Sequence, residues 1–127
     1  MIYGIGTDLV QMERIEKSLQ SPAFWQRVFG EEERAFLQAR QQKRQVEGAA
    51  ANFAAKEAFL KAIGTGIGGF ELHELQVLRQ PSGAPYFKLY GKAAQWMEQN
   101  HITLHISLSH DAGMAQAFVI LEQSGEK

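Results

Sequence analysis

The sequence predicts an α+β fold: a single compact domain in which an antiparallel β-sheet packs against one long buried helix and shorter helices. Helical periodicity fills most of the first half of the 127 residues, and alternating strand patterns joined by turns fill most of the second half. A chain of this length has room for one hydrophobic core. We therefore expect one domain over residues 1–127, with residues 124–127 as a frayed tail.

The N-terminal part predicts one strand followed by three short helices. The strand covers residues 2–10, which are rich in β-branched and aromatic side chains. Helices follow over residues 11–19, from Pro22 until Gly30, and from Glu31 to about Arg40, because proline and acidic residues favour the first helical turn.

The longest predicted helix runs from about Arg44 to Ile63 and ends at a glycine-rich loop, residues 64–69. The remaining elements are strands at 71–79, 86–89, 102–108 and 114–122, and a short helix at 92–99. His110 is expected in the polar turn between the last two strands.

Composition narrows the possible functions. The formal net charge is −1, so binding of nucleic acid through a general electrostatic attraction is disfavoured. The chain has no cysteine, which excludes thiolate nucleophiles and zinc–thiolate sites and is compatible with a reducing, cytoplasmic location. No stretch reaches the roughly 20 apolar residues of a membrane helix. A domain this small buries a modest share of its surface, so oligomerisation is a natural way to cover more.

The predicted long helix is apolar around nearly its whole circumference, which indicates a buried helix. Lys56, Glu57 and Lys61 nevertheless lie within it. Buried charges are costly unless they are paired or bind a metal or ligand, so a functional site is one interpretation. The other is a surface pair of Glu57 with Lys61, four residues on, and periodicity alone favours this simpler interpretation.

Asp8 also has two interpretations. It shares a strand face with Gly4 and Gly6, where missing side chains leave space for a ligand. Alternatively, Asp8 caps the following helix, with Gln11 as its partner in a capping box. In the first case two carboxylates and nearby lysines suit Mg²⁺ and phosphate chemistry.

Two further features are weaker. The basic residues Arg34, Arg40, Lys43 and Arg44 could hold phosphate or simply form a solvated helix face. The 64–69 loop lacks the lysine and hydroxyl residue of a P-loop and also suits a helix cap.

Two segments are recognisable. Residues 5–10 (IGTDLV), followed by Arg14, and residues 53–62 (FAAKEAFLKA), followed by 64–66 (GTG), resemble the two signatures of the 4′-phosphopantetheinyl transferases. Their separation resembles the small holo-acyl-carrier-protein synthase branch, and the likeness covers essentially the whole chain. It implies a 4′-phosphopantetheinyl transferase-like fold and a homotrimer with sites between subunits.

The resemblance implies transfer of 4′-phosphopantetheine from coenzyme A to a serine of an acidic acyl carrier protein, in support of fatty acid biosynthesis. Asp8 and Glu57 match the ligands of Mg²⁺ (Mn²⁺ is possible), and Lys61 joins them in catalysis. The serine proton goes either to Glu57 or to a water of the metal. Arg14 matches a residue that grips the carrier. The residues that match coenzyme A contacts are Lys43, Arg44, Lys56, Lys61, Gly64, Thr65, Gly66, Pro85 and His110.

The chain departs from the family pattern at two places. Asn52 stands where relatives often carry an arginine, and Ser21 stands near a second carrier-gripping arginine that Arg27 or Lys17 could replace. Two rival hypotheses are a non-catalytic coenzyme A or nucleotide-binding module and a structural partner protein whose charged seam is an oligomer interface.

Overall fold

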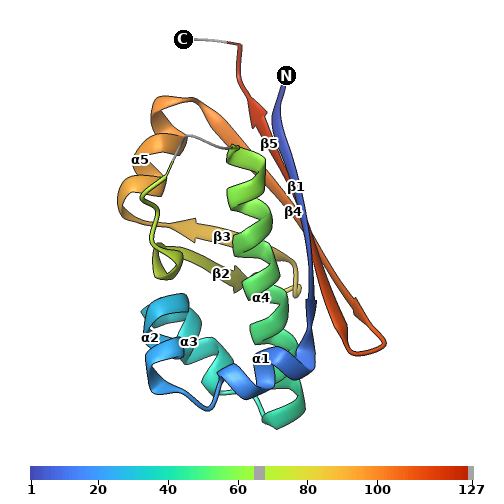
Figure 1. The fold of residues 1–127 in the computed structure, drawn as a ribbon. Helices are drawn as coiled ribbons and strands as arrows, with labels where there is room; N and C mark the ends of the chain where they lie inside the picture. Colours follow the sequence, from blue (N-terminus) through green and yellow to red (C-terminus); the bar gives the residue numbers. More distant parts are fainter. Residues whose placement is uncertain (65–67, 126–127) are drawn as a thin grey trace.

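The predicted α+β architecture is confirmed in a computed structural model that describes residues 1–64 and 68–125. Helix α4 (Gln42–Ile63) runs through the middle of the molecule (Figure 1). A three-stranded antiparallel sheet lies along one side of α4, and the β2–β3 hairpin and the shorter helices lie on the other side.

Most of the other elements agree closely with the sequence prediction, and η1 is the element that was not predicted. In chain order they are β1 (Ile2–Gln11), α1 (Met12–Ser18), α2 (Pro22–Val28), α3 (Glu31–Gln38), the 3₁₀ helix η1 (Leu72–Glu74), β2 (Leu75–Arg79), β3 (Pro85–Leu89), α5 (Gly91–Gln99), β4 (Ile102–Asp111) and β5 (Met114–Gln123). The predicted start of α2 is confirmed, since the Ser21 hydroxyl accepts a hydrogen bond from the Phe24 amide at 3.3 Å.

The three-stranded sheet has the order β1–β5–β4, so the last strand of the chain is central. The β4–β5 hairpin turns at Ala112 and Gly113, which both have positive φ angles of 51° and 77°. A two-residue turn of this kind leaves no room for a longer polar loop. The prediction that His110 lies in the turn is therefore wrong: His110 belongs to β4 and pairs with Ala115.

The strand predicted at 71–79 begins late. Residues Leu72–Glu74 form η1 instead, and the Glu74 amide donates to the Glu71 carbonyl at 3.0 Å. The Leu72 carbonyl accepts a hydrogen bond from Lys56 on α4 at 2.9 Å. A side chain distant in the sequence thus uses a backbone group that a strand would pair with another strand.

Two glycines allow β1 to lie directly on α4. A Cβ atom added to Gly4 would come within 1.9 Å of the Ala62 carbonyl oxygen, and one added to Gly6 within 1.8 Å of the Ala58 oxygen. The space that the sequence left for a ligand is therefore filled by the helix backbone. This close approach places Asp8, near the end of β1, beside Lys61 of α4.

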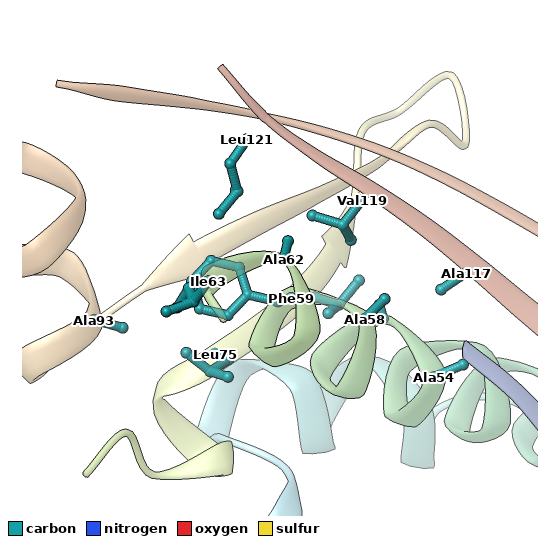
Figure 2. Packing of buried hydrophobic residues seen from close by; sticks show 12 residues of the cluster. Ala54, Ala58, Phe59, Ala62, Ile63, Leu75, Ala93, Ala117, Val119 and Leu121 are labelled. Carbon is teal, nitrogen blue, oxygen red and sulfur yellow. The ribbon is translucent and has the colours of Figure 1, made fainter. Parts of the chain in front are cut away.

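The main core forms where α4 meets the sheet and the hairpin. Figure 2 shows Ala58 and Ala62 of α4 near Val119 and Leu121 of β5, while Leu75 of β2 packs from another side. All of these side chains are buried. Alanines on the sheet side keep the helix close, and the larger residues fill the space around it. Over residues 1–64 and 68–125, none of the helices combines the length and apolarity that crossing a membrane requires.

Candidate active site

Strand β1 and helix α4 bring two predicted site residues together. The Asp8 carboxylate accepts a hydrogen bond from the Lys61 ammonium at an Oδ1–Nζ distance of 3.0 Å, and the Lys61 ammonium also donates to the Thr7 carbonyl at 3.0 Å. The capping interpretation of Asp8 is wrong, because Gln11 is the N-cap residue of α1 and makes no side-chain cap hydrogen bond. Strand β1 continues past Asp8 to Gln11, and the Asp8 side chain reaches Lys61 on α4.

Glu57 lies one turn before Lys61 on the same helix. Among the described residues, Lys61 forms its ion pair with Asp8 and not with Glu57, which corrects the surface-pair interpretation. The pKa of Glu57 is raised, first by its partial burial and then by the negative charge of Asp8, while Lys61 opposes the shift. The carboxylates of Asp8 and Glu57 therefore repel each other.

Asp8, Glu57 and Arg14 line one cavity of about 450 Å³. The rest of its wall is mostly apolar and is formed by Leu9, Val10, Ile15, Ser18, Phe24 and Phe53. Within the described part of the chain, no cluster of three or more metal-ligating side chains forms. A pair of repelling carboxylates still fits a magnesium ion, which takes few protein ligands and completes its coordination with water and phosphate oxygens.

Lys56 is placed differently from the expectation of a coenzyme A contact. Its side chain is fully buried, and its ammonium donates to the Glu33 carboxylate at 2.8 Å and to the carbonyls of Leu72 and Leu75 at 2.9 and 2.7 Å. Burial lowers the pKa of Lys56 and raises the pKa of Glu33, whereas their mutual attraction acts in the opposite sense on both. All three ammonium protons have protein partners, so we leave Lys56 out of the proposed coenzyme A contacts.

A second cavity, of about 240 Å³, collects three other predicted residues, namely Arg44, Pro85 and His110. Among the described residues, it shares no lining residue with the Asp8 cavity. Residues 44, 47, 48 and 51 of α4 face the second cavity, and residues 53 and 57 face the first. At 100° per residue these two groups point roughly 150° apart, so the cavities lie on nearly opposite faces of α4.

The remaining predicted contacts lie near the ends of α4. Lys43 lines a surface hollow with Arg44 at the N-terminal end. Gly64 ends the helix with a φ angle of 96°, which favours glycine. Thr65 and Gly66 lie outside the described residues.

Sequence reasoning missed two residues of these regions. Arg79 of β2 lines the second cavity, and nothing in the local strand pattern marks it as more than a surface residue. Glu33 was read as one of three acids that favour a helix start, yet it is fully buried. The signal for Glu33 was its spacing from Gly30, because its carboxylate accepts a hydrogen bond from the Gly30 amide at 3.1 Å, as in a capping box.

Comparison with known proteins gives a consistent result. The sequence model of the 4′-phosphopantetheinyl transferase superfamily matches residues 4–117. A holo-[acyl-carrier-protein] synthase of Syntrophus aciditrophicus is 43% identical, over 96% of this chain and 97% of the relative. Two crystal structures of holo-[acyl-carrier-protein] synthases are also similar. The structure from Bacillus anthracis in complex with CoA (3′,5′-ADP) has a TM-score of 0.82 and 36% identity, over 98% of this chain and 99% of that one. The structure from Neisseria meningitidis has a TM-score of 0.87 and 35% identity, over 97% of this chain and 100% of that one.

Proposed function

The chain belongs to the 4′-phosphopantetheinyl transferase superfamily, and from this membership we propose that it moves the 4′-phosphopantetheine group of coenzyme A to a serine of an apo acyl carrier protein. The products are holo-acyl carrier protein, which serves fatty acid biosynthesis, and 3′,5′-ADP. The observation that carries the proposal is that Asp8 and Glu57 line one cavity and Lys61 pairs with Asp8, on the two segments that carry the family signatures.

Asp8 and Glu57 are the proposed magnesium ligands. Burial and then the charge of Asp8 raise the pKa of Glu57, and a divalent cation would relieve the repulsion between the two carboxylates. When bound, Mg²⁺ supplies positive charge to the pyrophosphate of coenzyme A. Mn²⁺ has the same charge and also accepts carboxylate and water ligands, so it is expected to substitute.

The proposed reaction joins the serine oxygen of the carrier to the phosphorus nearer the pantetheine, and the bond from that phosphorus to the bridging oxygen of the pyrophosphate breaks. Lys61 is 57% exposed, so its ammonium can leave Asp8 and turn to the phosphate that departs with 3′,5′-ADP. The acceptor of the serine proton is either the Glu57 carboxylate, which lines the cavity, or a water beside it. Catalysis of this kind consists mainly of positioning and charge stabilisation.

Arg14 is the proposed contact for the acidic carrier. It is exposed on α1 and lines the same cavity as Asp8 and Glu57. A carrier held at Arg14 would therefore present its serine beside the two carboxylates. Opposite charges also steer association, which makes such docking sensitive to salt.

We propose further that each active site is shared between neighbouring subunits of a homotrimer. The pyrophosphate and the 3′-phosphate of coenzyme A are attached to the same ribose and so lie close together. Asp8 and Arg44, however, line cavities on nearly opposite faces of a helix that is about 10 Å across. One chain therefore offers two halves of a site. The outer face of the three-stranded sheet supports assembly, because Ile5, Leu9 and Phe118 are 54%, 59% and 42% exposed there.

The transfer is tested by measuring the intact mass of an apo acyl carrier protein after incubation with coenzyme A and the enzyme. We expect the mass gain of one phosphopantetheine group with Mg²⁺, and none with a chelator or with Glu57→Gln. Near-normal transfer by Glu57→Gln would refute the metal assignment. Binding without transfer would instead favour a coenzyme A-binding module.

The shared site is tested by complementation. Glu57→Gln and Arg44→Glu each damage a different half-site, so each variant alone is expected to be inactive. When the two variants are co-expressed, some interfaces of the mixed trimers combine two intact halves, and activity should return. Failure of the mixed oligomers to regain activity would place both halves in one chain.

A further inference from the structure

The second cavity has an unusual concentration of positive charge. Three arginines line it, Arg40, Arg44 and Arg79, and Glu47 is the one carboxylate of its wall within the described part of the chain. Over the same described residues, none of the three guanidinium groups forms an ion pair within 4.0 Å. Cations that gather around a hollow without carboxylate partners point to an anionic ligand.

Arg79 is held in place from the protein interior. Its Nη2 donates a hydrogen bond to the Asn52 side-chain oxygen at 2.9 Å. Asn52 is fully buried, and its side-chain nitrogen donates to the Glu33 carboxylate at 2.9 Å and to the Val77 carbonyl at 3.0 Å. These two bonds fix the orientation of the amide, so its oxygen must face Arg79.

The same ring orders both neighbouring guanidinium groups. The Cζ atoms of Arg40 and Arg79 lie 4.7 Å and 5.5 Å from the centre of the Phe36 ring. Burial, followed by the charge of Arg40, lowers the pKa of Arg79 to about 10. Arg79 is still charged at neutral pH, and the repulsion from Arg40 is a cost that a bound anion would relieve.

We propose that Arg79, together with Arg40, forms the receptor for the 3′-phosphate of coenzyme A and makes the enzyme selective for donors that carry it. This inference rests on the proposed function, which assigns the pyrophosphate to the Asp8 half-site and leaves the 3′-phosphate for this cavity. A phosphate monoester carries a charge of about −1.5 to −2 at pH 7 and suits the planar fork of a guanidinium. Asn52 is then a positioning residue for Arg79, which accounts for its presence where the family resemblance led us to expect an arginine.

The experiment compares the binding of 3′,5′-ADP and 5′-AMP by calorimetry, since the two nucleotides differ only by the 3′-phosphate. A charge-assisted bidentate contact is expected to make Arg79→Met weaken 3′,5′-ADP binding by roughly 10–100-fold and leave 5′-AMP binding nearly unchanged. Arg79→Lys keeps the charge but loses the fork, so it should fall between wild type and Arg79→Met. Arg34→Met, which removes an arginine outside both cavities, is the matched control and should bind both nucleotides like wild type.

Two results would overturn the inference: unchanged 3′,5′-ADP binding by Arg79→Met, or an equal loss for both nucleotides. If Arg79→Met does not fold, Arg40→Met tests the other arginine of the receptor. It should likewise weaken the binding of 3′,5′-ADP and leave that of the nucleotide without the 3′-phosphate nearly unchanged. The assay needs no turnover, so its outcome is separate from that of the transfer reaction. A protein that distinguishes the two nucleotides but transfers nothing would refute the proposed function and keep this inference.

Discussion

The importance of the buried ion pair is best tested by comparing the stability of two variants of α4, Lys56→Met and Lys61→Met, whose positions are five residues apart. Lys56→Met would leave the Glu33 carboxylate fully buried without its cation, and would also remove a donor from the carbonyls of Leu72 and Leu75. Breaking a buried ion pair in this way costs about 3–5 kcal/mol. Lys61→Met removes an exposed partner of Asp8, and such pairs contribute at most about 1 kcal/mol.

Two independent considerations give a similar magnitude for Lys56→Met. Glu33 can avoid a bare buried charge by taking a proton, and protonating a carboxyl of ordinary pKa 4.5 at pH 7 costs roughly 3 kcal/mol. That figure is close to the lower end of the mutational range. At roughly 4 °C per kcal/mol for a domain of this size, the melting temperature should fall by roughly 12–20 °C.

The assay is thermal unfolding followed by circular dichroism at pH 7 and at pH 4.5. In Lys56→Met the raised pKa of Glu33 makes the folded state bind more protons than the unfolded state, so the stability of the variant falls as pH rises. The gap between wild type and Lys56→Met should therefore narrow on acidification. Lys61→Met should melt within a few degrees of wild type and yet lose transfer activity by about 100-fold or more. If Lys56→Met melts within a few degrees of Lys61→Met at pH 7, the argument from burial is refuted.

Three further outcomes are expected. In chelator at pH 7, Glu57→Gln should raise the free energy of unfolding by a few tenths of a kcal/mol, within the range of about 0.2–1 kcal/mol for exposed charge pairs, and the melting temperature should rise with it. The gain should vanish below pH 4.5, because a raised pKa of Glu57 destabilises the fold only when its carboxyl is ionised. An equal gain at both pH values would contradict this explanation. Gly6→Ala forces β1 off α4 and should cost at least about 1–3 kcal/mol, with loss of transfer, whereas Gly68→Ala, with open space around it, should melt like wild type. Arg14→Glu should raise the KM for the carrier protein and reduce its dependence on salt, with the KM for coenzyme A unchanged.

Regular elements were predictable because their signals are local. The periodicity of residues 102–108 and of the long helix lies within one segment, and the structure departs from those predictions by a few residues at the ends. The larger errors have non-local causes. Leu72–Glu74 form a 3₁₀ helix where Lys56, sixteen residues from Leu72, takes a backbone carbonyl, and Gly4 and Gly6 accommodate a helix backbone more than fifty residues away.

The candidate site divides in the same way. Asp8, Glu57 and Lys61 were found because their residue types and spacing resemble a family signature, and the structure brings Asp8 and Lys61 into contact. Lys56 and Glu33 show what a signature leaves out. The motif identifies a lysine at position 56, but its partner lies 23 residues earlier in a helix whose sequence reads as an ordinary acidic N-terminus.

The two lysines of the signature therefore have different roles on α4: Lys56 makes buried contacts in the interior, and Lys61 makes an exposed contact with β1. Lys56 points into the interior and ties α4 to α3, η1 and β2 through Glu33 and two carbonyls, so the helix cannot rotate without breaking a buried ion pair. Lys61 lies on the sheet side, where Gly6 allows the backbone of β1 to come close enough for Asp8 to reach it. Because both faces are fixed, Glu57 is held beside Asp8 although the two carboxylates repel each other. The fold thus holds two repelling carboxylates side by side at the point where we propose that a divalent cation binds.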